Sequence, residues 1–330
     1  MRRRDFTSLL GGATLAWSVA AHAQQNERVR RVGILTAAAE SDQDGQAALA
    51  AFRKELRKLG WIEGRNLEIQ VRWAAGDVES MKRFAGELGA LQPDLVLTSS
   101  TPATAAMFQQ THTIPIVFVI VADPVGSGFV ASLPRPGGNV TGFTPIVRSL
   151  GSKWVELLKE IAPQITRVAL LFNPPTATFI DGYLEPFKGA AASVGAEAIV
   201  APINGMPDLE SLIATAASGP KTGLVIIPDA FTTRHRAEIT ALAARYRAPA
   251  IYWSRSFTDA GGLISYGPYI VDEYRRAALY ADRVLKGAKP SDLPVQAPVK
   301  FEMVINLGTA KALGLDVTPS LLASADDVID

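Results

Sequence analysis

The chain has 330 residues, of which 48% are hydrophobic and none is cysteine, and its formal net charge is +1. This length and apolar content allow two domains with sizeable cores, while the absence of cysteine excludes disulfide bonds. A charge so close to zero argues against a nucleic-acid-binding protein, which needs a basic surface. Stability therefore has to come from apolar burial.

The first 23 residues are predicted to form an export signal. Residues 2–4 are arginines, residues 9–20 form a short and weakly apolar stretch, and residues 21–23 are a small-residue cleavage site. The arginine pair followed by Asp-Phe resembles a twin-arginine signal, with general secretory export as the alternative. No later stretch offers 18 uninterrupted apolar residues, and no cysteine is present to carry a lipid anchor. We therefore expect a periplasmic mature chain from Gln24 onward, without stable membrane insertion.

Short β-branched runs then alternate with helical stripes, the pattern of a parallel sheet covered on both faces. After a strand over residues 31–36 comes a helix, which ends at Gly60 and whose apolar stripe contains Leu49, Phe52, Leu56 and Leu59. In chain order, a strand over 67–73, a helix over 78–91, and strands over 94–98 and 114–121 follow. These elements predict one α/β lobe.

A second series starts near residue 152, and its strand over 167–172 is similar in sequence to the strand over 31–36. Three helical stripes belong to this series: Trp154, Leu157, Leu158 and Ile161; Leu209, Leu212, Ile213 and Ala216; Ile239, Leu242, Ala243 and Tyr246. Further strands are predicted over 223–227 and 248–252. The pattern indicates two similar Rossmann-like lobes.

Three segments rich in turn formers or proline are predicted to connect the lobes: residues 133–142, 261–267 and 289–298. Three crossings favour a hinge over a flexible tether, because each restricts the relative rotation of the lobes. We expect an N-terminal lobe of residues 24–143 plus 268–290. The C-terminal lobe is expected to contain residues 144–267 plus 291–330.

The sequence lacks the common catalytic and cofactor motifs. It contains no dinucleotide fingerprint, phosphate loop, nucleophile elbow or zinc-protease motif. His112 and His235 stand apart, and residues 42–45 match only a fragment of a calcium loop. We therefore expect no catalytic residue, cofactor or metal. The alternatives are an exported hydrolase or oxidoreductase that uses an interlobe cleft, and a ligand-sensing transcription factor, which needs a DNA-binding helix pair where the export signal lies.

Polar residues at or just after strand ends are the candidate ligand-binding residues, because an open α/β sheet binds its ligands there. The set is Thr36, Ser99, Ser100, Thr101, Asp123, Asn173, Asp229, Ser254 and Tyr266. Thr101 is expected to cap a helix that starts at Pro102, so that free N–H groups and the helix dipole favour an anionic ligand group. An aspartate in the same cleft would pair with an ammonium group.

Four segments carry a family resemblance: residues 135–142, 261–267, 300–306 and 309–315. They resemble the ABC-transporter substrate-binding proteins of the tryptophan/tyrosine-uptake type, and the likeness runs over essentially the whole mature chain. The resemblance implies a type I periplasmic binding fold, whose two lobes close on a small molecule. The solute would be an amino acid or a related aromatic or carboxylate compound, delivered by a monomer to an ABC permease and its ATPase.

The resemblance also implies where the solute binds. It places the ligand near Ser99 to Thr101, Asp123, Asn173, Asp229 and Tyr266, all of which the strand ends had already indicated. Residues 175–178 differ from the small polar segment expected in relatives. This departure leaves the identity of the solute open.

Overall fold

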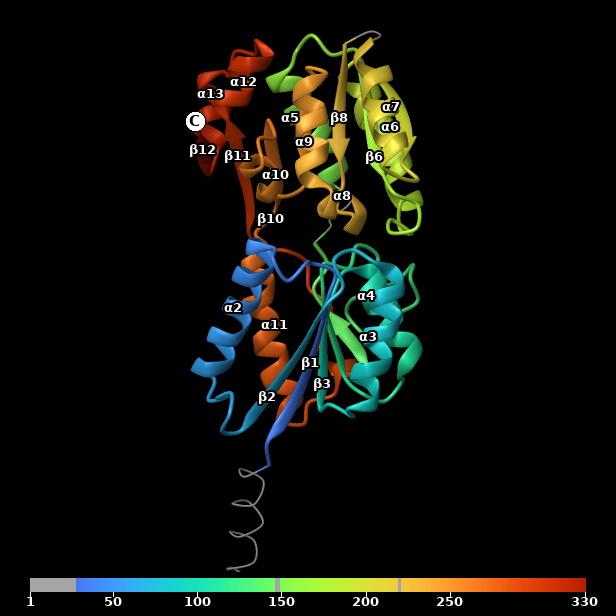
Figure 1. Ribbon diagram of the computed structural model, residues 1–330, viewed down its shortest axis with the longest axis vertical. Helices are drawn as coiled ribbons and strands as arrows, with labels where there is room; N and C mark the ends of the chain where they lie inside the picture. The colour runs from blue at the N-terminus through green and yellow to red at the C-terminus, as the bar shows by residue number, and fades with distance from the viewer. Residues whose placement is uncertain (1–27, 146–148, 219–220) are drawn as a thin grey trace, which may run out of the picture.

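The protein consists of two lobes stacked along its long axis (Figure 1). The computed structural model describes residues 28–145, 149–218 and 221–330, so the predicted export signal lies outside the described residues. Each lobe is built around one sheet. Within the described ranges, no helix has the length and apolar character needed to cross a membrane.

The first lobe contains a five-stranded parallel sheet in the order β2-β1-β3-β4-β5. Its strands are β1 (Arg30–Thr36), β2 (Leu67–Trp73), β3 (Leu95–Ser99), β4 (Ile116–Val119) and β5 (Val140–Gly142). Helices α2 (Gln43–Lys58) and α11 (Ile270–Leu285) cover one face, and α3 (Val78–Ala90) and α4 (Thr101–Gln110) cover the other. Neighbouring strand residues serve opposite faces: Ile34 packs in the cluster of Phe52 from α2, and Leu35 in that of Met81 from α3.

The second lobe contains a seven-stranded sheet in the order β12-β11-β10-β9-β8-β6-β7. Its strands are β6 (Arg167–Phe172), β7 (Glu197–Pro202), β8 (Thr222–Ile226), β9 (Ala250–Tyr252), β10 (Ile264–Pro268), β11 (Phe301–Asn306) and β12 (Asp327–Ile329). Its helices are α5 (Ser149–Ile161), α6 (Asp181–Ser193), α7 (Met206–Ser218), α8 (Ala230–Arg234), α9 (Arg236–Arg245), α10 (Arg255–Asp259), α12 (Leu307–Leu313) and α13 (Pro319–Ser324). Only the β10–β11 pair is antiparallel among these strands, a feature that the alternating pattern did not predict.

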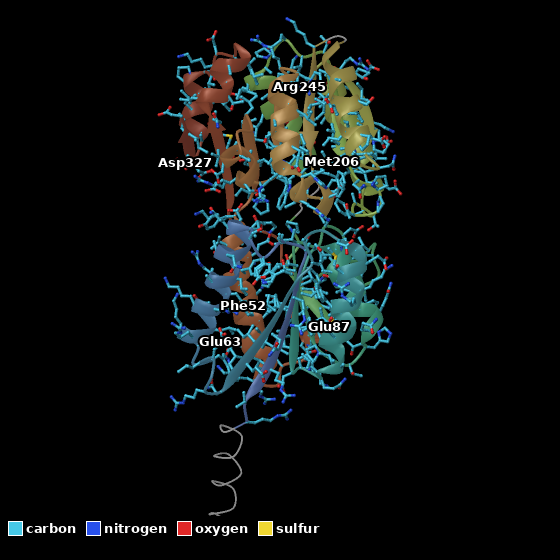
Figure 2. The ribbon with its side chains drawn as sticks, in the orientation of Figure 1. Phe52, Glu63, Glu87, Met206, Arg245 and Asp327 are labelled. Atoms are coloured by element: carbon cyan, nitrogen blue, oxygen red, sulfur yellow. The ribbon has the colours of Figure 1, made fainter. Side chains whose placement is uncertain are left out.

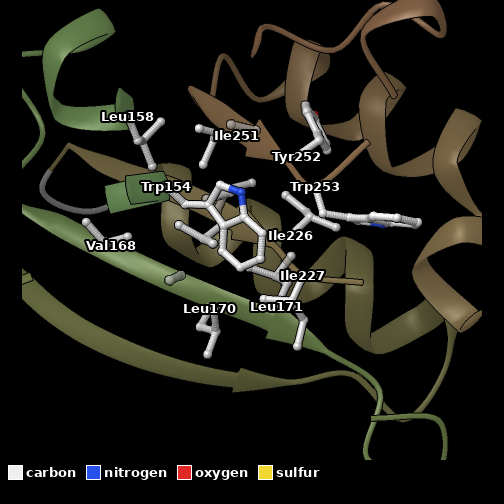
Figure 3. Packing of buried hydrophobic residues seen from close by; sticks show 14 of the residues in the cluster. Trp154, Leu158, Val168, Leu170, Leu171, Ile226, Ile227, Ile251, Tyr252 and Trp253 are labelled. Atoms are coloured by element: carbon white, nitrogen blue, oxygen red, sulfur yellow. The ribbon is translucent and has the colours of Figure 1, made fainter. Parts of the chain in front are cut away.

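Trp154 of α5 lies at the centre of the second lobe's core (Figure 3). Its ring packs in one cluster with Leu158, Val168 and Ile226, and the residue is 1% exposed. The indole N–H donates to the Tyr266 carbonyl oxygen at 2.6 Å, so the buried donor is satisfied. This bond ties α5 to β10, the last strand before the chain returns to the first lobe.

The first and second crossings lie at the C-terminal ends of the segments predicted to connect the lobes, next to the expected lobe boundaries at residues 143/144 and 267/268. Residues 133–142, expected to connect the lobes, end in β5, which pairs with β4 at the edge of the first sheet. Gly142 allows this pairing, because a Cβ there would collide with the Phe118 carbonyl oxygen. Residues 264–267, expected in the second crossing, belong to β10 of the second sheet. The chain therefore crosses after Gly142 and again around Pro268.

The third crossing lies later than expected. Residues 291–296, assigned to the C-terminal lobe by the sequence pattern, run along the edge strand of the first lobe. Thr141 Oγ1 donates to the Leu293 carbonyl at 2.5 Å, and the Gln296 N–H donates to the Gly142 carbonyl at 3.0 Å. The crossing therefore follows Gln296. This segment begins with the 3-10 turn Pro290–Asp292, which contacts β5 of the same lobe.

Arg276, in the second turn of α11, contacts the chain at the first and third crossings. Its guanidinium lies 4.9 Å from the centre of the Phe143 ring, next to the first crossing. It also donates to the Ala297 carbonyl at 3.0 Å and to the Gln296 side-chain oxygen, both at the third crossing. Because α11 itself follows the second crossing, this side chain links the helix after that crossing to the other two hinge segments.

Glu273 lies one turn before Arg276 and is 2% exposed. Neither carboxylate oxygen has a hydrogen-bond partner at bonding distance within the described part of the chain. Burial raises the pKa of Glu273 to about 8, although the nearby Ile120 N–H and Arg276 oppose this shift. A carboxyl group at the hinge is therefore held in its neutral form at neutral pH.

The raised pKa of Glu273 predicts a pH-dependent stability. Between pH 4.5, its ordinary pKa, and about 8, the folded protein keeps a proton that the unfolded chain releases. The free energy of unfolding should therefore fall as pH rises, by up to about 1.4 kcal/mol per pH unit. We expect Glu273→Gln to match the wild type near pH 4 and to exceed it at pH 8, as measured by urea unfolding. Glu79→Gln, on an exposed helix face, is the control, and a pH-independent effect of Glu273→Gln would contradict the prediction.

Candidate functional site

A cleft of about 420 Å³ lies between the lobes and is lined by residues of both. The strands of the two sheets end at it: Thr36 and Ser99 are the last residues of β1 and β3, Asp229 follows β8, and Trp253 follows β9. Side chains from both lobes meet at this junction (Figure 2). The carboxyl edges of two largely parallel sheets thus face each other, which is the usual position of ligand sites in open α/β sheets.

The first lobe contributes a group of hydroxyl side chains. Thr36, Ser99 and Thr101 are buried and line the cleft, together with Ser100. The Ser99 and Thr36 hydroxyls bond to the Tyr274 hydroxyl and lower its pKa, but burial outweighs them and raises it. Tyr274 belongs to α11, so an element from late in the chain completes this hydroxyl group.

Helix α4 begins at the cleft, one residue earlier than predicted. Ser100 is the N-cap, and its Oγ accepts from the Ala103 N–H at 3.3 Å, whereas Thr101 is the first helical residue and Pro102 the second. Thr101 Oγ1 instead accepts from the Ala122 N–H at 3.4 Å. Ser100 has a φ of 99°, a conformation that costs a non-glycine residue about 1–3 kcal/mol. The fold thus holds a strained residue at the cleft, beside the positive end of a helix dipole.

Asp229 is the buried carboxylate that the second lobe contributes. Its Oδ1 accepts from Thr176 Oγ1 at 2.5 Å and from the Phe231 N–H at 2.7 Å, and its Oδ2 accepts from the Asn173 N–H at 2.5 Å. Burial raises the pKa of Asp229, and these hydrogen bonds oppose the rise. The Thr232 N–H is a further donor to this carboxylate. Groups of its own lobe therefore supply most of the donors that a carboxylate can accept.

Six of the nine candidate residues line the cleft, and three do not. Thr36, Ser99, Ser100, Thr101, Asp229 and Ser254 are brought together there. Asn173 lies behind Asp229 and Thr176, where its amide donates to the Ile203 carbonyl at 2.7 Å. Asp123 accepts from the Gly126 N–H and lines a neighbouring hollow that also contains Thr101. Tyr266 stacks on Phe301, with ring centres 5.7 Å apart, outside the cleft lining.

An ion pair across the cleft was missed by the sequence analysis. Arg236, at the start of α9 in the second lobe, donates to Asp42 of the first lobe at 2.6 Å. Asp42 also caps α2, because its other oxygen accepts from the Gly45 N–H at 3.2 Å. Burial, followed by the neighbouring charge of Asp42, raises the pKa of Asp44 on the same rim, while Arg236 opposes this rise. The two partners are separated by 194 positions in the sequence, so no local pattern reveals the pair.

Aromatic side chains from four places in the chain also line the cleft, namely Phe179, Trp253, Tyr269 and Tyr274. None of the four is among the nine candidate residues that the sequence predicts. Tyr269 and Tyr274 lie where the chain re-enters the first lobe. By its position in the apolar stripe of α11, Tyr274 is expected to be a core residue. Over the ranges that the structure describes, no cluster of three or more His, Cys, Asp or Glu side chains is arranged to hold a metal ion.

Comparison with known proteins identifies relatives of this two-lobed architecture. The chain is 26% identical over 269 residues to a tyrosine-binding protein of Clostridioides difficile strain R20291, a match that covers 81% of this chain and 76% of the relative. A conserved domain protein from Vibrio cholerae has a similar structure, with a TM-score of 0.84 and 27% identity over 91% of this chain and all of that one.

Two further solved structures share the fold. An ABC domain from Streptococcus pneumoniae in complex with L-Trp has a TM-score of 0.82, with 24% identity over 91% of this chain and all of that one. A ligand-free, open substrate-binding protein from Clostridium difficile has a TM-score of 0.68, with 25% identity over 92% of this chain and 99% of that one. These matches confirm the predicted α/β fold of two Rossmann-like lobes, which is the type I periplasmic binding fold.

A family model covers almost all of the described chain. The model of the ABC transporter substrate binding proteins matches residues 38–329, and so includes both lobes and every residue of the cleft except Thr36 and Ala37. Nothing in these comparisons supports the hydrolase or oxidoreductase alternative. The chain therefore belongs to the ABC transporter substrate-binding protein family, and its role is to bind a solute.

Proposed function

We propose that this protein binds an aromatic amino acid in the interlobe cleft and delivers it to an ABC permease with its ATPase. One observation carries the proposal: hydroxyl groups and a helix N-terminus from one lobe line the same cleft as a buried carboxylate from the other, together with aromatic side chains. This arrangement matches a carboxylate, an ammonium group and a ring. The tyrosine-binding relative and the L-Trp complex support the same ligand class.

The ligand carboxylate is proposed to bind at Ser99, Ser100 and Thr101. The Ser100, Ala103 and Thr104 N–H groups are bonded within the protein, and Pro102 has none. The dipole of α4 therefore favours a negative charge there, by up to about 2 kcal/mol in a partly buried setting. The hydroxyls of Thr36 and Tyr274 border the same place. The strained backbone of Ser100 is of the kind that concentrates at ligand sites.

The ligand ammonium group is proposed to bind Asp229, with Ser254 beside it. A cation next to this carboxylate would offset the burial that raises its pKa. Asn173 takes a positioning role, because its backbone N–H and its contact with Thr176 hold the carboxylate in place. Asp123 and Tyr266 would then support the cleft walls rather than contact the solute.

Binding is proposed to close the lobes, without any chemical change to the solute. A ligand that contacts both lobes stabilises the closed arrangement by the contacts that exist only there. The Asp42–Arg236 pair adds to the same arrangement, since it joins the two lobes at the rim of the cleft. We further propose that the protein acts as a monomer in the periplasm, after export directed by residues 1–23.

A ligand screen tests this function. We expect L-tyrosine, L-tryptophan or L-phenylalanine to raise the melting temperature of the chain lacking residues 1–23, whereas D-glucose and succinate leave it unchanged. Ser99→Ala should weaken amino-acid binding by about 1 kcal/mol, or roughly fivefold, because it removes a hydrogen bond to the carboxylate. Ser211→Ala, on an exposed face of α7, is the control. If none of the amino acids shifts the melting temperature, the ligand class is wrong.

Removal of the cross-cleft ion pair tests the closure mechanism. Arg236→Gln leaves Asp42 without its partner, so the closed arrangement should lose about 1 kcal/mol and affinity for L-tyrosine should fall roughly fivefold. Arg245→Gln is a matched control, because Arg245 pairs with Glu210 on the outer surface of the second lobe (Figure 2). Calorimetry gives the affinity, and small-angle scattering gives the radius of gyration without ligand. An Arg236→Gln protein as compact and as tight-binding as the control would refute this role.

A further inference from the structure

Trp253 carries a hydrogen-bond donor, its indole N–H, that has no partner in the described part of the chain. The residue directly follows β9, lines the cleft and is 5% exposed. Its indole Nε1 is buried and has no hydrogen-bond partner among the residues that the structure describes. Buried tryptophan N–H groups usually have a partner, because an unpaired donor away from water is costly.

Other tryptophans of the chain show the usual arrangement. Trp61 Nε1 donates to Asp282 at 2.9 Å, and Trp154 Nε1 donates to the Tyr266 carbonyl at 2.6 Å. Trp253 belongs to the same core cluster as Trp154, and in Figure 3 its ring points away from the Trp154 ring. The unpaired donor thus belongs to the one of these three rings that faces the cleft.

The fold holds this ring in place from behind. Gly267 of β10 lies so close to the backbone of Trp253 that a Cβ at position 267 would collide with the Trp253 carbonyl oxygen. Ser254, the next residue, caps α10 by accepting from the Ser256 N–H at 3.4 Å. With its backbone fixed on both sides, Trp253 presents a rigid donor. Its indole N–H has almost no exposed surface in this arrangement of the lobes.

We propose that the Trp253 N–H is a specificity determinant that binds an acceptor on the ligand's side chain, such as the phenolic oxygen of tyrosine. This inference rests on the proposed function, in which the α4 N-terminus of the opposite lobe takes the ligand carboxylate. The chemistry then separates the aromatic amino acids. Phenylalanine has no side-chain acceptor, and the indole of tryptophan is a donor only. A site built to bond a hydroxyl group rejects an analogue that lacks it, because its buried donor is left unpaired.

The test compares the wild type with two variants, and L-tyrosine and L-phenylalanine are the probes. We expect the wild type to bind tyrosine at least tenfold more tightly than phenylalanine, which corresponds to one hydrogen bond of ordinary strength. Trp253→Phe keeps an aromatic ring but lacks the N–H, so its preference for tyrosine should disappear while its phenylalanine affinity stays near that of the wild type. Trp61→Phe, which removes a different indole N–H in the first lobe, should keep the wild-type preference.

A second measurement uses the wild-type protein, so it does not require Trp253→Phe to fold and bind. In the ¹⁵N spectrum, the Trp253 indole signal should move on addition of L-tyrosine and not L-phenylalanine, while the signals of Trp61 and Trp154, whose donors are already bonded, stay in place. Equal loss of both affinities in Trp253→Phe, or an unchanged preference for tyrosine, would overturn the inference and leave the proposed function standing. A wild-type protein that binds no aromatic amino acid would overturn both.

Discussion

Parallel strands all end at the same edge of a sheet, and in this protein two such edges face each other across one cleft. That constraint explains why residues as distant as Thr36 and Trp253 are neighbours of one cavity. Each sheet buries its own apolar clusters, so each lobe has its own hydrophobic core. The cleft between them is lined by polar, aromatic and small apolar residues.

The polar groups of the cleft differ in how completely the protein satisfies them. Asp229 accepts hydrogen bonds from groups of its own lobe and is held by Asn173 and Thr176, so its position is set before any ligand arrives. The Trp253 indole N–H has no hydrogen-bond partner within the described ranges. Because both lie on the second lobe, that lobe supplies a preorganised acceptor and an unused donor. The first lobe supplies hydroxyl groups at a helix N-terminus.

The hinge and the cleft are linked through α11. This helix follows the second crossing, packs on the first lobe, and carries Tyr274 at the cleft and Arg276 at the hinge. Glu273 of the same helix is buried, and this burial raises its pKa and keeps the carboxyl group neutral. A change in the relative position of the lobes therefore acts on the residues that line the cleft. The Asp42–Arg236 ion pair provides a second connection between the lobes, from the N-cap of α2 to the first residue of α9.

Local patterns were sufficient to predict most elements of the first lobe, and three strands and three helices of the second, because the period of apolar residues reflects which face of a helix or strand is buried. The helix with Leu49, Phe52 and Leu56 and the strand over 67–73 have the predicted places. Strands β5 and β12 were missed, since each has only three residues and β5 lies within a segment of turn formers. The antiparallel β11 was missed because strand direction depends on the path of the chain between lobes.

By itself, the sequence determined the two α/β lobes, the family, and the strand-end positions of Thr36, Ser99, Ser100, Thr101, Asp229 and Ser254, because these follow from local periodicity and from motifs along the chain. Only the tertiary structure decided which strand ends share the cleft: it brought in Tyr269, Tyr274 and the Asp42–Arg236 pair, and it placed Asp123, Asn173 and Tyr266 outside the lining. The physical reason is that side-chain neighbours across a cleft depend on how two separately packed sheets are oriented. Three crossings and a hinge set that orientation, and no local pattern records it.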